Sequence, residues 1–198
     1  MMFRRSVLAL GLAPYLAHAG NQIEEPLADS ARTALSSAIA NAAPPEPEFT
    51  DTNSRITYIR WLGEMSTRLG QLTKQRLDIT TRQEFLQTVW YESRRAGLEA
   101  SLVLGLVQVE SAFRKHAVSS VGARGYMQVM PFWSRLIGDG DAGKLFHMQT
   151  NLRFGCLILR HYLDREGGDM FMALGRYNGS RGRAEYPNSV LAAKRRWD

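Results

Sequence analysis

The 198-residue sequence contains only one cysteine and four histidines. A single cysteine excludes an internal disulfide, and because Cys156 falls on an apolar helical stripe we expect a buried, inert thiol. Cys156 is also far from the N-terminus, so we expect no lipid anchor on an N-terminal cysteine exposed by processing. The histidines are scattered without ligand spacing, and the sequence therefore predicts no metal site and no cofactor.

Several longer patterns are missing as well. There is no convincing run of alternating strand residues, no internal repeat and no apolar stretch of about 20 residues that could span a bilayer. No cluster of arginines and aromatics typical of nucleic-acid-binding modules stands out, so nucleic acid is not an expected partner. With 44% hydrophobic and 22% charged residues, the composition is that of a soluble globular protein with one domain.

The first 19 residues have the pattern of a secretory signal peptide. Residues 1–5 are basic, residues 7–16 are mostly apolar, and Ala17-His18-Ala19 is a small-x-small cleavage signal. The alternative is an amphipathic N-terminal helix of a cytosolic protein. We expect an exported, soluble mature protein, located in the periplasm or secreted. The net charge of +6, which loss of the signal peptide would lower by two, favours anionic partners such as a cell-wall polymer, nucleic acid or a membrane surface.

Proline and apolar spacing divide the rest of the chain. Residues 20–52 should form a leader or linker, because three prolines at 44, 45 and 47 break an Ala-rich stretch. Residues 53–79 should form an N-terminal helical extension, and residues 80–198 a compact helical domain. The extension repeats apolar residues in steps of three and four, at Ile56, Ile59, Leu62, Met65, Leu69 and Leu72. The predicted fold class is all-α.

Caps and breakers predict the helix boundaries within residues 80–198. Thr81-Arg82-Gln83-Glu84 is a capping-box pattern that would open a helix, and Gly97 fits the C-terminal cap of that helix. The next helices should run from Glu99 to Phe113 and from Pro131 to Gly138, before a Gly- and Asp-rich surface loop at 138–147. Further along the chain we expect a helix with Arg153, Arg160 and Asp164 on its polar side, a helix capped by Asp169, and a last helix that Pro187 opens.

Glu110 is the residue that fits this pattern least well. It follows Leu102 and Leu106 at four-residue spacing, so it continues the apolar stripe of its helix. Burial there, together with the unfavourable macrodipole at a helix C-terminus, would raise the carboxyl pKa and keep the group protonated near neutral pH, as a general acid requires. An ion pair with Arg114, four residues on, is equally compatible with the spacing.

The loop after this helix offers small hydroxyls, flexible backbone and an amide. These groups suit a neutral polyhydroxylated ligand, although an ordinary surface loop would also be rich in Gly and Ser. The apolar residues around Gln128 favour a loop packed beside a groove. The polar and flexible residues are Ser119, Ser120, Gly122, Gly125 and Gln128, and the apolar ones are Tyr126, Met127, Val129 and Met130.

Four groups of residues follow one another along the chain. They are Glu110-Ser111 with Ser119 and residues 122–131 (GARGYMQVMP), then Asn151 and Gly155, then residues 173–178 (ALGRYN), and last Tyr186 and Val190. In this order they resemble the signature, the Asn-x-x-x-Gly, the Ala-Leu-x-x-Tyr-Asn and the terminal Tyr and Val of a known family, the soluble lytic transglycosylases, which have a goose-lysozyme-like fold and are of the glycoside hydrolase family 23 type. The resemblance covers about residues 85–192 and leaves residues 20–75 outside.

The resemblance implies a role for each matching side chain. Glu110 would be the catalytic acid and then the base, and Tyr177 would hold it in place with a hydrogen bond. The substrate-binding residues would be Ser111 and Ser119, which would contact sugar or Glu110, Gln128 and Met130, which would line the groove, and Asn178, which would support the same wall together with Tyr177. On its own spacing, Tyr177 would be interpreted as a core aromatic.

Two positions depart from the family pattern. Tyr126 stands where the family has Leu, and its ring would add a stacking surface for sugar. Gly175-Arg176 stands in place of two small residues, and Arg176 would meet a peptide or wall carboxylate.

The activity implied by the resemblance is cleavage of peptidoglycan between N-acetylmuramic acid and N-acetylglucosamine. Ordinary glycosidases use two carboxylates, whereas Asp139, Asp141, Asp164 and Asp169 look like loop or cap residues. The family resolves this by substrate assistance, in which the muramyl 6-hydroxyl closes a 1,6-anhydro ring. The rival enzyme is a hydrolytic muramidase on the same fold. From a different class, the protein would be a non-catalytic wall-binding component of an envelope-spanning secretion or conjugation machine.

Overall fold

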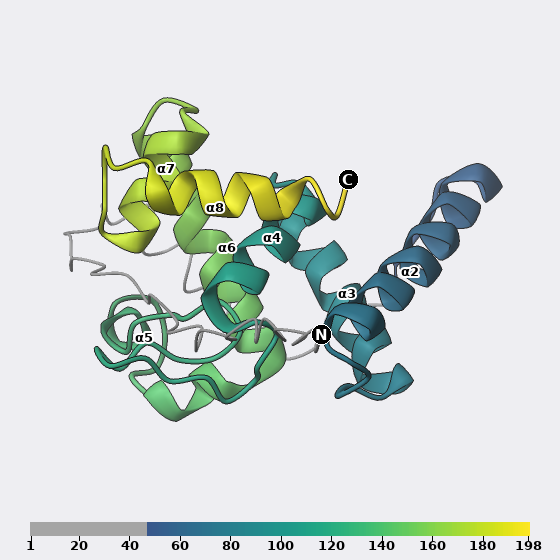
Figure 1. Cartoon of the computed structure of the whole chain (residues 1–198), viewed down its shortest axis with the longest axis horizontal. Coiled ribbons are helices and arrows are strands. Elements are labelled where there is room, and N and C mark those ends of the chain that lie inside the picture. Colours follow the sequence, from purple (N-terminus) through teal and green to yellow (C-terminus); the bar gives the residue numbers. More distant parts are fainter. Residues whose placement is uncertain (1–46) are drawn as a thin grey trace, which may run out of the picture.

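The computed structural model describes residues 47–198, whose regular structure is helical (Figure 1). No β-strand occurs in this range; two isolated antiparallel bridges join Arg124 to Val118 and to Val129. The predicted all-α fold class is therefore confirmed. The predicted signal peptide and most of the predicted leader lie outside the described residues. The elements are α2 (Thr52–Leu72), α3 (Ile79–Arg95), α4 (Ala100–Ser111), α5 (Phe132–Ile137), the 3₁₀ helix η1 (Ala142–Phe146), α6 (Met148–Arg165), α7 (Met170–Asn178) and α8 (Glu185–Lys194).

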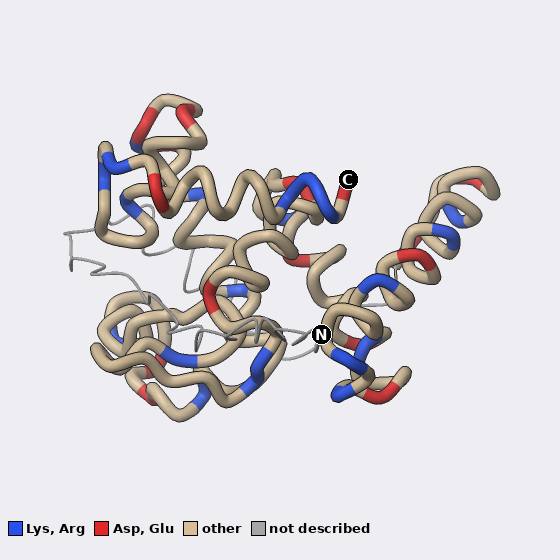
Figure 2. Tube along the Cα trace, viewed as in Figure 1, with Lys and Arg blue, Asp and Glu red and all other residues tan. Residues whose placement is uncertain are grey.

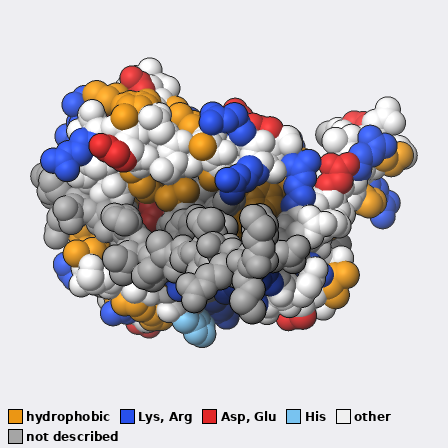
Figure 3. Space-filling model, viewed as in Figure 1, with side chains coloured by type: hydrophobic (Ala, Val, Ile, Leu, Met, Phe, Trp, Pro, Cys, Tyr) orange, Lys and Arg blue, Asp and Glu red, His pale blue; other side chains and the backbone are white. Residues whose placement is uncertain are grey.

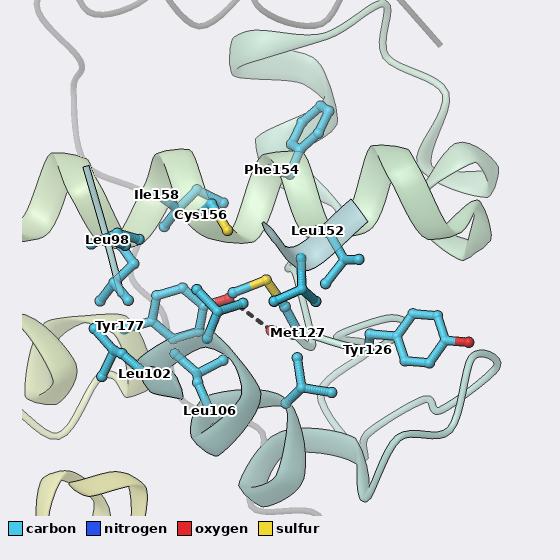
Figure 4. Close-up of a cluster of buried hydrophobic side chains, with 14 of the residues drawn as sticks. Leu98, Leu102, Leu106, Tyr126, Met127, Leu152, Phe154, Cys156, Ile158 and Tyr177 are labelled. Atoms are coloured by element: carbon cyan, nitrogen blue, oxygen red, sulfur yellow. Dashed lines mark hydrogen bonds between the residues drawn. The ribbon is translucent and has the colours of Figure 1, made fainter. Parts of the chain in front are cut away.

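Helix α4 lies at the centre of the core and is buried from Ser101 to Val107. A helix that is apolar on all sides has to be enclosed, and Figure 1 shows α8 crossing it on one side. The two helices meet most closely at Gly105, where a Cβ atom would lie 2.6 Å from the backbone nitrogen of Lys194. Figure 4 shows Leu102 and Leu106 of α4 close to Tyr177 of α7, with Cys156 and Ile158 of α6 above them.

The observed helix caps confirm most of the predicted helix boundaries, and the exception is the start of α3. Helix α3 begins a turn earlier than predicted because Asp78, not Thr81, is the N-cap: its carboxylate accepts a hydrogen bond from the Thr81 amide at 2.9 Å. Gly97 adopts the predicted left-handed conformation at the end of α3, with a φ of +64°. Asp169 caps α7 as predicted, accepting from the Met172 amide at 3.0 Å.

Two further predictions are wrong in part. Residues 138–147 contain η1, and its Leu145 is fully buried, so this segment is anchored to the core rather than lying wholly on the surface. Pro187 is the third residue of α8, which begins at Glu185. In both cases the sequence pattern locates the segment correctly, but tertiary packing decides which of its residues are helical or buried.

Helix α6 buries a residue that was expected to face solvent. Arg153 is 2% exposed, and its Nε lies 2.8 Å from Oε1 of Glu92 on α3, which is 1% exposed. Arg160 and Asp164 lie on the polar side of this helix as predicted, and they form an ion pair there. Cys156 is fully buried with a free thiol, and burial raises its pKa well above the ordinary value, as expected of an inert cysteine.

Helix α2 is attached to the domain through its C-terminal half. Met65 and Leu69 are buried in the common core, and Trp61 lies 4.8 Å from Trp90 of α3 between ring centroids. The other half protrudes in Figure 1, and Figure 3 shows apolar side chains exposed on it. None of the helices within residues 47–198 is long and apolar enough to cross a membrane, and no three His, Cys, Asp or Glu side chains in this range are grouped as metal ligands.

Candidate active site

Glu110 lies in the last turn of α4 and is 2% exposed. Its Oε1 accepts a hydrogen bond from the hydroxyl of Tyr186 at 2.5 Å, and its Oε2 is buried without a hydrogen-bond partner among the described residues. Burial raises the pKa of Glu110 to about 8, although the Tyr186 hydrogen bond acts in the opposite direction. The alternative of an ion pair with Arg114 is wrong, because neither carboxyl oxygen of Glu110 contacts an arginine within residues 47–198 and Nε of Arg114 donates instead to the Ser111 carbonyl at 3.0 Å.

The chain turns sharply immediately after this acid. Ala112 and Phe113 both have left-handed backbone conformations, with φ of +48° and +60°. Such conformations cost non-glycine residues about 1 kcal/mol or more each, so the surroundings have to stabilise them. The ring of Phe113 is 2% exposed and packs edge-on against Phe85 and Trp197, with centroids 5.8 and 5.5 Å away. This packing fixes where α4 ends and hence where Glu110 lies.

Ser111 connects the end of α4 to the loop at 126–130. Its hydroxyl lies 2.7 Å from the carbonyl oxygen of Tyr126, to which it donates, and the side chain is 1% exposed. The predicted contact with Glu110 is therefore wrong, since the hydroxyl is used to position the loop. The sugar-stacking role predicted for Tyr126 is also wrong, because its ring is 1% exposed and packs 4.9 Å from Phe85.

Asn151 and Gly155 of α6 hold the same loop from the other side. The Asn151 Oδ1 accepts from the Met127 amide, and its Nδ2 donates to the carbonyls of Arg124 and Leu145, each at 2.8 Å. A Cβ at Gly155 would lie 2.7 Å from the Cβ of Met127, so glycine is needed for this contact. These two motif residues therefore act by fixing the loop.

The predicted partner of Tyr177 is also wrong. Its hydroxyl donates to the carbonyl of Met127 at 2.8 Å, shown by the dashed line in Figure 4, and the residue is fully buried. The residue that donates to Glu110 is Tyr186. The sequence identifies Tyr186 as a motif residue but gives it no role, because only the crossing of α8 over α4 brings it to Glu110, 76 residues earlier.

The other predicted substrate-binding residues lie in or beside this loop. Gln128 donates from Nε2 to the carbonyls of Ala117 and Gly125, at 3.1 and 2.9 Å, whereas its buried Oε1 has no partner among residues 47–198. Asn178 donates to Ser180, and its buried Oδ1 likewise lacks a partner within that range. Ser119 accepts from the Ala123 amide, and Met130 is half-buried against the core. Sugar contacts by these residues stay a prediction.

Arg176 has a partner within the chain. It forms an ion pair with Glu166, which also accepts two hydrogen bonds from Arg181, at 2.8 and 2.9 Å. The hydrogen bonds from both arginines lower the pKa of Glu166 to about 2. Within the chain Arg176 thus helps to fix the turn between α7 and α8, which leads to Tyr186, and its contact with a peptide or wall carboxylate stays a prediction.

The helical architecture and the buried acid at a helix end define a lysozyme-like α-helical domain. The chain belongs to the family described as the Transglycosylase SLT domain, which matches residues 88–196. This range contains Glu110, the loop at 126–130, Asn151, Tyr177 and Tyr186.

Individual relatives agree with this assignment. A transglycosylase of Enterobacteria phage PRD1 is 34% identical over 115 residues, covering 54% of this chain and 42% of the relative. A membrane-bound lytic murein transglycosylase C of Actinobacillus pleuropneumoniae serotype 5b is 37% identical over 91 residues, covering 42% and 25%. The chain thus spans less than half the length of these relatives.

A solved structure supports the fold. The X-ray structure of an inactive mutant of the lytic transglycosylase Slt from Pseudomonas aeruginosa superposes with a TM-score of 0.53 and 24% identity. The superposition covers 72% of this chain and 29% of that one.

Removing the Tyr186 hydroxyl should change the titration of the acid. In Tyr186→Phe the charged form of Glu110 loses the hydrogen bond that stabilises it, so its pKa should rise above about 8. We expect a kcat lower by about tenfold, because the carboxylate formed after proton transfer loses this stabilisation, and an alkaline limb of the pH–rate profile that moves to higher pH. A fall in kcat with an unchanged profile would contradict this role for Tyr186.

Proposed function

We propose that the chain is a peptidoglycan lytic transglycosylase. It cleaves the β-1,4 bond between N-acetylmuramic acid and N-acetylglucosamine and forms 1,6-anhydromuramic ends. The observation that carries this proposal is Glu110: a carboxyl with a pKa of about 8 and one oxygen held by Tyr186 is protonated at neutral pH. The murein transglycosylases among the relatives support peptidoglycan as the substrate.

The two steps use the two oxygens of Glu110. Oε2, which has no partner among the described residues, carries the proton and donates it to the glycosidic oxygen as the bond to C1 of muramic acid breaks. Tyr186 stabilises the resulting carboxylate through Oε1. The carboxylate then takes the proton of the muramyl 6-hydroxyl, whose oxygen bonds to C1. Glu110 is therefore protonated again at the end of the reaction, and no water is consumed.

The positions of the other acids favour this reaction over hydrolysis. A hydrolytic muramidase would need a second carboxylate to hold a water. The four aspartates considered for this role have local structural partners: Asp139 pairs with Lys144, Asp141 accepts from the Gly143 amide, Asp164 pairs with Arg160, and Asp169 caps α7.

The products distinguish the candidate functions. Purified protein incubated with peptidoglycan should release muropeptides whose muramic ends are one water lighter by mass than the hydrolytic products. Reducing muramic ends without anhydro ends would instead indicate the muramidase. Binding to the wall without any release of muropeptides would indicate the non-catalytic wall-binding component.

The location and partners of the protein belong to the same proposal. The signal-peptide pattern of residues 1–19 supports export to the compartment that holds peptidoglycan. A secretion or conjugation machine as partner stays a prediction. Fractionation of cells that express the full chain tests the location, and accumulation in the cytosol would contradict it.

A further inference from the structure

The loop after α4 borders an open surface pocket with a volume of about 310 Å³, lined by Arg114, His116, Ala117 and Val118. We propose that this pocket binds a carboxylate of the peptide attached to the glycan strand, so that it forms an acidic-peptide subsite on the loop that follows the helix of Glu110. This inference rests on the proposed function for the identity of the polymer.

The charge around the pocket favours an anionic ligand. Between Glu99 and Asp139 the only acidic residue is Glu110, whereas the same segment carries Arg114, Lys115, Arg124 and Arg135. The loop that follows α4 accordingly carries Lys and Arg segments in Figure 2. N-acetylglucosamine is neutral and does not need such a field, whereas a peptide carboxylate is both attracted and oriented by it.

Arg114 is held with its donors available. Its Nε donates to the Ser111 carbonyl at 3.0 Å, which ties the guanidinium to the end of α4. Within residues 47–198 its terminal nitrogens form no hydrogen bond or ion pair. A guanidinium oriented in this way can bind a carboxylate through parallel hydrogen bonds.

The part of the loop around His116 is also fixed in position. The His116 ring packs edge-on against Phe146 of η1, with centroids 5.8 Å apart. The Arg124 guanidinium lies over the same ring at 5.5 Å and donates to the Ala142 carbonyl at 2.8 Å. Because His116 packs against η1 and Arg124 donates to it, this part of the loop is held in place before any ligand binds, and less ordering entropy opposes binding.

The pocket shares its floor with a predicted sugar-binding residue. The Ala117 carbonyl accepts from the Gly125 amide at 2.9 Å and from Nε2 of Gln128 at 3.1 Å. The Ala117 carbonyl and its hydrogen bonds would therefore connect a sugar bound at Gln128 to a peptide carboxylate bound at Arg114. Val118, which is 58% exposed at the rim, offers apolar contact for the aliphatic part of a peptide.

Two forms of one substrate test the proposal: peptidoglycan with its stem peptides, and the same peptidoglycan after its peptide carboxylates are converted to neutral amides with carbodiimide and ammonia. For Arg114→Gln, the ratio of kcat/KM on the untreated form to that on the amidated form should fall about tenfold, mostly through KM, because a charge-assisted hydrogen bond is lost. The matched control is Arg60→Gln, an exposed arginine on α2, which should leave the ratio unchanged.

An equal loss on both substrates would overturn the proposal, because Arg114 would then act only by positioning the end of α4. No loss on either would overturn it as well. If the wild-type protein cleaves neither substrate, the proposed function fails, and calorimetry with the isolated acidic stem peptide tests the pocket separately. Binding that weakens about tenfold in Arg114→Gln would support the subsite, and equal or undetectable binding by both proteins would overturn it.

Discussion

Replacing Glu110 by glutamine should lower kcat for peptidoglycan cleavage by about 10²–10⁴-fold, the usual contribution of a general acid–base group. Glutamine has nearly the same shape and its amide oxygen can still accept from Tyr186, so the change removes the transferable proton and little else. The measurement is the rate at which soluble muropeptides are released from purified peptidoglycan. Unchanged release would remove Glu110 from the mechanism.

The control for this variant separates catalysis from binding. Cosedimentation with intact peptidoglycan should be retained in Glu110→Gln, since no contact outside the carboxyl is altered. Glu64→Gln, the same substitution at an exposed position on α2, should have wild-type rates. Loss of cosedimentation together with activity would indicate that Glu110 serves binding rather than proton transfer.

The Glu110→Gln variant should also differ from wild type in how its folding stability depends on pH. The pKa of Glu110 is raised from 4.5 to about 8, so the folded protein binds this proton more tightly than the unfolded chain. The resulting stabilisation is fully present below about pH 4.5 and is lost as the pH rises through about 8. Glutamine does not titrate, so thermal unfolding should show Glu110→Gln gaining stability relative to wild type between these two pH values. A difference that is independent of pH would contradict the raised pKa.

The sequence predicts features whose causes are local. The spacing of Glu110 behind Leu102 and Leu106 is sufficient to predict its burial, because three residues one turn apart share a helix face. Gly97 and Asp169 are found as caps because the chemistry of a helix end depends on a few neighbouring residues. The motif residues Asn151 and Gly155 are found by resemblance, without an indication that they act on Met127.

The remaining features depend on contacts between distant segments. The choice between Tyr177 and Tyr186 as the partner of Glu110 is decided by the crossing of α8 over α4, which requires Gly105. Spacing along one helix could not decide it, since both tyrosines lie on apolar stripes. Arg153 was misplaced for the same reason: a charged residue is expected at the surface unless its partner is known, and that partner lies 61 residues earlier.

The second large effect is expected from breaking this buried pair. In Arg153→Met, Glu92 keeps its burial and loses the partner 2.8 Å away. Removing one member of a buried ion pair typically destabilises a protein by about 3–5 kcal/mol, which corresponds to about 10 °C in Tm for a chain of this size. Arg160→Met, on the same helix but in an exposed pair, should change stability by about 1 kcal/mol or less.

The pH dependence and a double variant identify the cause of this loss. The pKa of Glu92 is raised by burial even though Arg153 opposes the shift, so without Arg153 the carboxyl should take up a proton more readily still. The deficit of Arg153→Met should therefore shrink as the pH falls toward 4.5, because the raised pKa leaves Glu92 increasingly protonated in the folded state of both proteins. Replacing both residues, as Glu92→Leu/Arg153→Met, should recover most of the lost stability, because no buried charge remains. If the double variant is no more stable than Arg153→Met, the loss comes from the packing of the arginine side chain between α3 and α6, and the buried charge is not its cause.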